Sequence, residues 1–191
     1  MIGQTLLPTL IESAIPSVLA SSFTLLVGFI AYLCKTKKDK SKSCIITSIA
    51  LENFVDEFIN IYFNNREYLS TMGNEGILNT TSPKFKTSEI KINWNSLSGH
   101  IIKEIFSVES RINTARRIIQ RNYNPNYTHG DYEVDYIINI TPIAIYALDL
   151  AQRLRKYGSL SRLEDFEELA KSLQNIEQDR IDIMRKQNNA L

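Results

Sequence analysis

The chain has 191 residues, 43% hydrophobic and 23% charged, a composition that allows one sizeable folded core. Five lysines, Glu12 and Asp39 are the only charged side chains before residue 43, so residues 43–191 hold 17 of the 22 basic and 19 of the 21 acidic side chains. A nucleic-acid-binding domain is expected to be clearly basic, so this balance excludes nucleic acid as an expected partner. Two cysteines, Cys34 and Cys44, are too few for a disulfide framework.

An uncharged stretch near the N-terminus predicts a transmembrane helix. From Ser13 to Leu33 no side chain is ionisable apart from Tyr32. About 20 helical residues at about 1.5 Å each cover about 30 Å, the thickness of the hydrocarbon core of a bilayer. We therefore expect residues 13–34 to cross the lipid bilayer once and residues 1–12 to form a short extracytoplasmic tail.

Two other interpretations of this stretch are a buried core helix and a cleaved signal peptide. A core helix of this length seldom lacks a charged face. A signal peptide has basic residues before its apolar run and a small-x-small site after it, whereas here the lysines follow the run and no such site is present. Both comparisons favour the membrane anchor.

A basic juxtamembrane segment at residues 35–43 predicts the orientation. Positive charges close to a membrane span stay on the cytoplasmic side, so we expect the N-terminus outside and the C-terminal domain in the cytosol. The frequent isoleucine, asparagine and lysine suggest an AT-rich genome and hence a bacterial inner membrane. The lysines are also candidates for contact with anionic lipid, although a stop-transfer signal alone is the simpler interpretation. These lysines are Lys35, Lys37, Lys38, Lys40 and Lys42.

Residues 44–187 are expected to form a helical cytosolic domain, followed by a tail at residues 188–191. Apolar side chains recur at three- and four-residue steps from Ile45 to Tyr62, which predicts a helix that ends near Tyr68. This helix either continues from the membrane span or is separated from it by a break around residues 38–43. Residues 70–93 are rich in turn residues, and weak alternation over residues 85–92 suggests a short strand.

Two further helices are predicted from their apolar stripes. One opens at residues 95–97 and ends before Pro125. The next covers about residues 131–157, with a kink at Pro142 and Gly158 as its C-cap.

Residues Ser161 to Glu164 match a capping box, which predicts that a fourth helix begins there. Each stripe needs partners, and four amphipathic helices that share one core make a bundle. The fold class is therefore all-α: one N-terminal transmembrane helix followed by a cytosolic bundle of about four helices.

No catalytic, cofactor-binding or metal-binding residue is assigned. The sequence has no GxSxG motif, P-loop, dinucleotide fingerprint or HExxH motif. His100 and Glu104 can meet on one helix face, but a transition-metal site needs at least three ligands. Residues 122–133 match the ligand spacing of a calcium loop, yet asparagines replace the aspartates and Tyr127 occupies the glycine position, so a turn is the better interpretation.

Two surface features are weaker candidates for binding and are not assigned as sites. An arginine cluster on the second cytosolic helix is most simply a solvated helix face. Four tyrosines around the next connection form an aromatic-rich surface. These residues are Arg111, Arg116, Arg117 and Arg121, and Tyr123, Tyr127, Tyr132 and Tyr136.

The functional hypothesis is a membrane-anchored interaction module that recruits a protein partner or self-associates at the cytosolic membrane face. The alternative is an oligomerising membrane effector or channel component, whose spans would meet through small and polar residues of the anchor. An enzyme without a recognisable motif is the third hypothesis. The biological process and the partner are not predicted.

Overall fold

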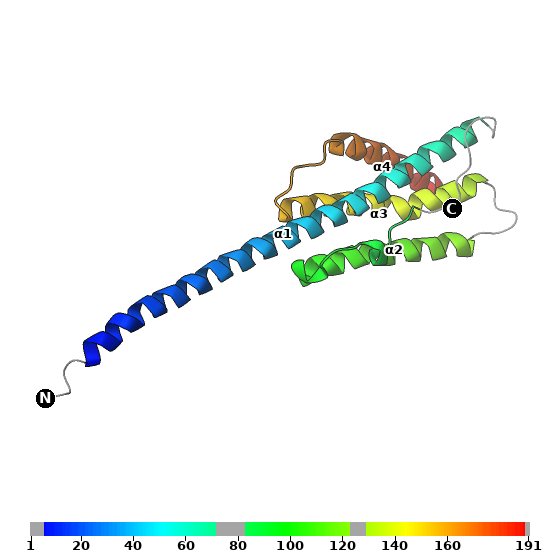
Figure 1. The fold of residues 1–191 in the computed structure, drawn as a ribbon. Helices are drawn as coiled ribbons and strands as arrows, with labels where there is room; N and C mark the ends of the chain where they lie inside the picture. The colour runs from blue at the N-terminus through cyan, green and yellow to red at the C-terminus, as the bar shows by residue number, and fades with distance from the viewer. Residues whose placement is uncertain (1–5, 72–82, 123–128, 190–191) are drawn as a thin grey trace. The chain divides into compact units, whose positions relative to one another are not determined.

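The computed structural model describes residues 6–71, 83–122 and 129–189, and the side chains of residues 23–71, 83–122 and 132–189. Within these ranges the chain is helical or irregular and contains no strand, so the all-α fold class is confirmed. The described residues form α-helices, which Figure 1 labels, and short 3₁₀ turns. They are α1 (Leu6–Ser70), η1 (Thr87–Glu89), η2 (Trp94–Ser96), α2 (Gly99–Asn122), α3 (His129–Tyr157) and α4 (Phe166–Asn189).

The chain divides into two compact units, residues 1–39 and residues 40–191. Helix α1 belongs to both units and continues without a break through residues 38–43. In the first unit the described large apolar side chains are all exposed. Phe23 and Leu33, the first and last of them along the chain, are 68% and 49% exposed. The others are Leu25, Leu26, Val27, Phe29, Ile30 and Tyr32.

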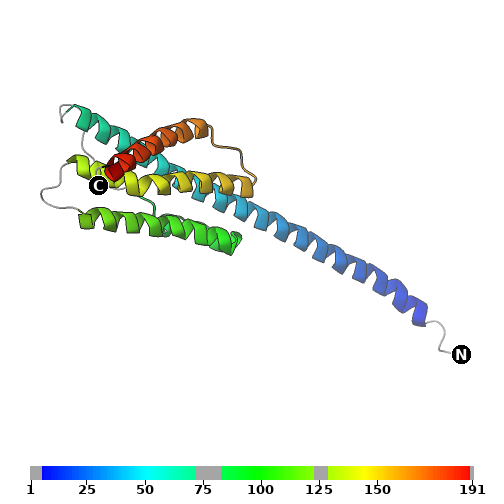
Figure 2. The same ribbon diagram turned by 180° about the vertical axis from the view of Figure 1, so that it is seen from behind.

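The second unit is a helical bundle with one apolar core. In both views α3 lies between α2 and α4 (Figure 2), and α3 packs against each of them. The α1 segment from Lys40 onward closes the core with Leu51, Phe54, Val55 and Phe58, each with no exposed surface. Large core side chains of the other helices are Ile105, Val108, Ile112, Tyr136, Ile140, Leu150, Leu154 and Ile176.

The buried face of α1 differs in part from the predicted stripe. Ile45 and Ile49 were expected in the core but are exposed, whereas Thr47 and Ser48 are fully buried. The Ser48 hydroxyl donates to the Ile45 carbonyl over 3.0 Å, which satisfies a polar group inside the bundle without a partner from another helix. In this part of α1, small hydroxyl side chains therefore face the core, where isoleucine side chains are predicted.

The strand predicted over residues 85–92 is wrong. This segment contains the turn η1, and Thr87 bonds to α2 rather than to a second strand. The backbone N–H and hydroxyl of Thr87 donate to one Glu109 carboxylate oxygen, over 3.0 and 2.5 Å. Phe85, Thr87 and Ile90 are buried, which explains the alternation in the sequence.

Two predicted helix starts are also displaced. Residues 95–97 fall in and after η2, and α2 begins only at Gly99. The capping box at Ser161–Glu164 does not start α4, which begins at Phe166; the Asp165 carbonyl accepts from the Leu169 N–H over 3.0 Å. The Ser161 carbonyl instead accepts from Arg155 over 3.3 Å, so this segment is held as a connection.

Gly158 is the C-cap of α3, as predicted, but it is not the left-handed residue of the cap. The left-handed residue is Ser159, with φ of 55°, and the N–H groups of Ser159 and Leu160 donate back to Lys156 and Arg155, as in a Schellman motif. Gly158 is required for a different reason: a Cβ there would lie 2.7 Å from the Cys44 Cβ. Upstream, α3 continues through Pro142.

Replacement of Gly158 with alanine should destabilise the bundle by about 1–3 kcal/mol, because the added methyl overpacks the contact with Cys44. Gly99→Ala is the matched control, since nothing lies within 4 Å of its Cβ position. Urea unfolding of the full chain in detergent measures the difference. Burial raises the pKa of the Cys44 thiol, against a smaller lowering by Lys40, and so keeps this thiol unreactive in the folded bundle. Loosening of the contact in the alanine variant should therefore speed alkylation of Cys44, which is a second readout. Equal stability of the two variants would contradict the prediction.

Candidate functional site

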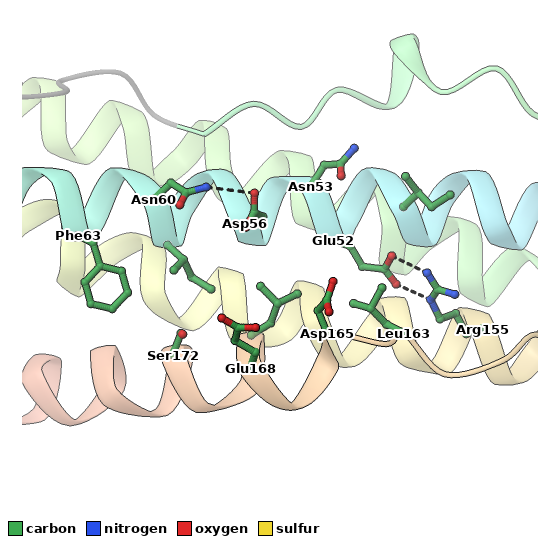
Figure 3. A pocket seen from close by; sticks show the side chains of 13 residues that line it. Glu52, Asn53, Asp56, Asn60, Phe63, Arg155, Leu163, Asp165, Glu168 and Ser172 are labelled. Carbon is green, nitrogen blue, oxygen red and sulfur yellow. Dashed lines mark hydrogen bonds and ion pairs between the residues drawn. The ribbon is translucent and has the colours of Figure 1, made fainter.

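A groove of about 600 Å³ lies between α1 and α4 and is the candidate functional site (Figure 3). Its α1 wall is a single helix face with residues at three- and four-residue steps: Ile49, Glu52, Asn53, Asp56, Ile59, Asn60 and Phe63. The opposite wall begins with Asp165, directly before α4, and follows the same steps along α4 with Glu168, Leu169 and Ser172. Arg155 and Leu163 line the remaining border. Both walls therefore have the spacing at which helices present residues to a neighbouring helix.

A buried ion pair fixes one end of the groove. The Arg155 guanidinium donates two hydrogen bonds to the Glu52 carboxylate, over 2.6 and 2.7 Å. The two side chains are only 12% and 9% exposed. The bond with Glu52 raises the pKa of Arg155 despite the opposing effect of burial. Glu52 is thus neutralised within the bundle and holds α1 against the C-terminal end of α3.

The other three carboxylates of the groove carry uncompensated charge. Asp56, Asp165 and Glu168 are exposed, and none of them has an ion-pair partner among the described side chains. The Asn60 amide donates to Asp56 over 3.1 Å, which orients this carboxylate without neutralising it. Figure 3 shows Asp56 on α1 and Glu168 on α4, on facing walls. The groove is therefore electronegative from both sides.

Apolar side chains accompany these charges. Ile49 and Phe63, fourteen positions apart on α1, are 43% and 45% exposed. The Phe63 ring makes an edge contact with Tyr62, with 5.1 Å between the centroids, and it points toward α4 in Figure 3. Leu163 and Leu169 are partly buried on the opposite side. An occupant of the groove would meet apolar surface at both ends and negative charge between.

Beyond Phe63, a polar cluster bridges α1 to α4. The Tyr62 hydroxyl donates to the Asp179 carboxylate, and Arg66 donates to both Asp179 and the Tyr62 oxygen. Burial, followed by the bond to Asp179, raises the pKa of Tyr62 to about 12. This cluster fixes the distance between the two groove walls.

The groove offers binding groups rather than a recognisable reactive set. Its polar side chains are carboxylates, amides, one guanidinium and the Ser172 hydroxyl, and no histidine or cysteine lines it. Within the described residues no three histidine, cysteine or acidic side chains gather as metal ligands. Nothing in this arrangement activates a nucleophile.

The candidates from the sequence lie elsewhere and hold the bundle together. The Glu104 carboxylate accepts from Arg153 over 2.7 Å and from Tyr146 over 3.3 Å, while His100 lies 3.7 Å away. Burial acts to raise the pKa of Glu104, but the bonds and charge of Arg153 outweigh it and lower this pKa. The His100–Glu104 pair is therefore part of a link between α2 and α3.

The arginine cluster and the tyrosines are also largely structural. Arg111 stacks over the Tyr146 ring at 4.5 Å, and Arg116 donates to the Pro83 carbonyl over 2.9 Å. Tyr136 is fully buried and stacks with Tyr132. Residues 123–128, which include Tyr123, Tyr127 and half of the calcium-like pattern, lie outside the described residues.

One helix in the described part of the chain is long and apolar enough to cross a membrane, and it is not the predicted one. It covers Tyr132–Tyr157, with a mean hydropathy of 1.4 and 56% of its most apolar window buried. The predicted span at 13–34 is helical, but side chains before Phe23 lie outside the described residues. The lysines that follow it are exposed except Lys40, which lies 3.5 Å above the Tyr157 ring.

Comparison of the chain with protein families, with curated proteins and with solved structures finds no match.

Removal of one partner of the Glu52–Arg155 pair should destabilise the bundle strongly, whereas replacement of both side chains by apolar ones should destabilise it little. Glu52→Gln leaves the buried guanidinium without its counter-charge and is expected to destabilise the bundle by about 3–5 kcal/mol. The double variant Glu52→Leu/Arg155→Met should recover most of this loss. Urea unfolding of the double variant and of its two single variants, Glu52→Leu and Arg155→Met, gives the coupling energy. Glu167→Gln, in an exposed pair with Arg162, is the control. Additive effects of the two single changes would contradict the prediction.

The Tyr62 cluster should make the bundle sensitive to alkali. The raised pKa means that the folded state retains the phenolic proton, so this contribution is complete below about pH 10 and is lost as the pH rises toward about 12. The loss amounts to at most roughly 3 kcal/mol. Tyr62→Phe should lower stability at neutral pH but flatten the alkaline decline. Parallel stability curves for wild type and variant between pH 9 and 12 would refute this assignment.

Proposed function

We propose that the protein is a membrane-anchored helical interaction module, held by the N-terminal part of α1 and recruiting a protein partner at the cytosolic membrane face. The observation that carries the anchor is the exposed apolar surface of α1 between Phe23 and Leu33. Its side chains leave the helix in every direction, so a single protein neighbour would cover only part of them. Lipid covers all sides of such a helix at once.

The position of the exposed lysines supports the same anchor. Lys35, Lys37 and Lys38 follow directly on the exposed apolar turns of α1. A span that began near Ser13 would give the apolar part a length of about 30 Å, which matches the hydrocarbon core. Positive charges at this end favour retention of residues 40–191 in the cytosol.

The second apolar helix, α3, is accounted for without a membrane. Its most buried side chains, among them Tyr136, Ile140 and Leu150, contact the other helices of the bundle. Its apolar character is what a central bundle helix between two neighbours requires. We therefore place one span in the membrane and keep α3 in the bundle.

The recruiting role is supported by the groove between α1 and α4. Its exposed apolar residues, Ile49 and Phe63, and its three uncompensated carboxylates are surface features that the bundle itself does not use. Exposed apolar side chains bordered by polar ones fit the apolar core and polar rim of protein–protein contacts.

The anchor and its orientation are tested together in bacterial cells that produce the full chain with a C-terminal epitope. The protein should resist alkaline extraction, and its epitope should be protected when protease is added to spheroplasts. Exchange of Lys35, Lys37, Lys38 and Lys42 for asparagine, with four lysines introduced before Ser13, should expose the epitope. Lys40 is kept because it contacts Tyr157. Loss of four lysines of the bundle, Lys84, Lys91, Lys103 and Lys171, is the control and should leave the epitope protected. Extraction of the wild-type protein without detergent would overturn the proposal.

A further inference from the structure

The walls of the groove are two helix faces with the same spacing, which sets the shape of what fits between them. The α1 wall from Ile49 to Phe63 covers about 21 Å, or four helical turns. A third helix laid in this groove can pack against both rows at once, as in a helix bundle. A drug-sized ligand is a poorer fit, because such sites are concave and mostly apolar, whereas five groove residues here are both polar and exposed. They are Asn53, Asp56, Asn60, Asp165 and Glu168.

The charge of the groove sets the chemistry of the occupant. Asp56 on one wall and Asp165 and Glu168 on the other repel each other, and no cation of the described residues pairs with them. A lysine or arginine side chain placed between the walls relieves this repulsion, and the exclusion of water strengthens the attraction. Apolar side chains on the same face of the occupant would cover Ile49 and Phe63.

We propose that the α1/α4 groove binds one amphipathic helix of a partner protein, which places basic side chains against Asp56 and Glu168 and apolar side chains against Ile49 and Phe63. This inference rests on the proposed recruiting function and names the chemical class of the partner. The binding mode is a helix in a groove, read out at three- and four-residue steps.

The acidic start of α4 has a simpler explanation that accounts for only part of the charge. Asp165, Glu167 and Glu168 lie where negative charge complements the helix dipole. Asp56, in contrast, lies in the interior of α1, far from either end of that helix. Glu167, which does not line the groove, pairs with Arg162 over 2.8 Å, whereas Glu168, which does, pairs with no described cation. The helix dipole therefore does not explain why carboxylates lie on both walls of the groove.

Binding is measured by fluorescence anisotropy with the full chain in nanodiscs of zwitterionic lipid, which avoids attraction of a basic peptide to the bilayer. The probe is a designed helical peptide of about 18 residues, with lysines at the centre of its apolar face and leucines at both ends. Asp56→Asn/Glu168→Gln should weaken its binding by about tenfold or more. Glu167→Gln, in the same helical turn but outside the groove, should change it less than about twofold.

The apolar contact has its own matched pair. Phe63→Ala should weaken binding by about tenfold, because the exposed ring is buried by the peptide. Phe106→Ala is the control, since Phe106 is 48% exposed on α2 and also has one aromatic neighbour, Trp94. Circular dichroism checks that each variant is folded, and a variant that unfolds is replaced by Phe63→Leu, which keeps an apolar side chain and should retain part of the affinity.

A charge exchange decides the outcome. A peptide with glutamates in place of its lysines should not bind the wild-type chain but should bind the Asp56→Lys/Glu168→Lys variant. Failure of the lysine peptide to bind, equal binding to the Asp56→Asn/Glu168→Gln variant, or crosslinking of two copies through the groove in place of peptide binding would overturn the inference. Because the anchor is tested by extraction and protease protection, either proposal can fail while the other stands.

Discussion

The bundle depends on the close approach of α1 to the C-terminal end of α3. Gly158 leaves room for Cys44, the Ser41 hydroxyl donates to the Gly158 carbonyl over 2.6 Å, and Lys40 covers the Tyr157 ring. This contact fixes where α3 ends and where the chain crosses to α4. The buried pair of Glu52 and Arg155 continues the contact further along α1, so the position of the groove follows from it.

Sequence periodicity was sufficient for the helices but not for their ends or for the buried face of α1. The apolar stripe of α2 recurs as predicted, because Ile105, Val108 and Ile112 all face one core. The ends differ because a capping pattern such as Ser161–Glu164 is short and satisfies a connection equally well. Ser48 shows the limit of hydropathy: its hydroxyl bonds within its own helix, so a polar residue costs little where helices pack closely.

The groove could not have been recognised from the sequence, although its residues are visible there. Its walls come from positions about a hundred residues apart, and each wall mixes large apolar side chains with carboxylates and neutral polar groups. Such a face resembles an ordinary solvated helix surface until the fold brings the two rows together. The one available signal was that Ile49, Asp56 and Phe63 share a seven-residue spacing on α1. By contrast, His100 and Arg111 looked chemically distinctive and serve the packing of α2 and α3.

An anchor and a weakly apolar groove suit each other physically. A few uncompensated carboxylates and two exposed apolar side chains give modest affinity in solution, because exposed ion pairs contribute little and ordering an occupant helix costs entropy. The proposed anchor would confine the bundle to a membrane and raise its effective concentration toward any partner held at the same surface, so that affinity would grow without further contacts. A groove that selects its occupant by charge and offers little apolar area would therefore discriminate among partners at the membrane. Without membrane confinement it would remain largely empty.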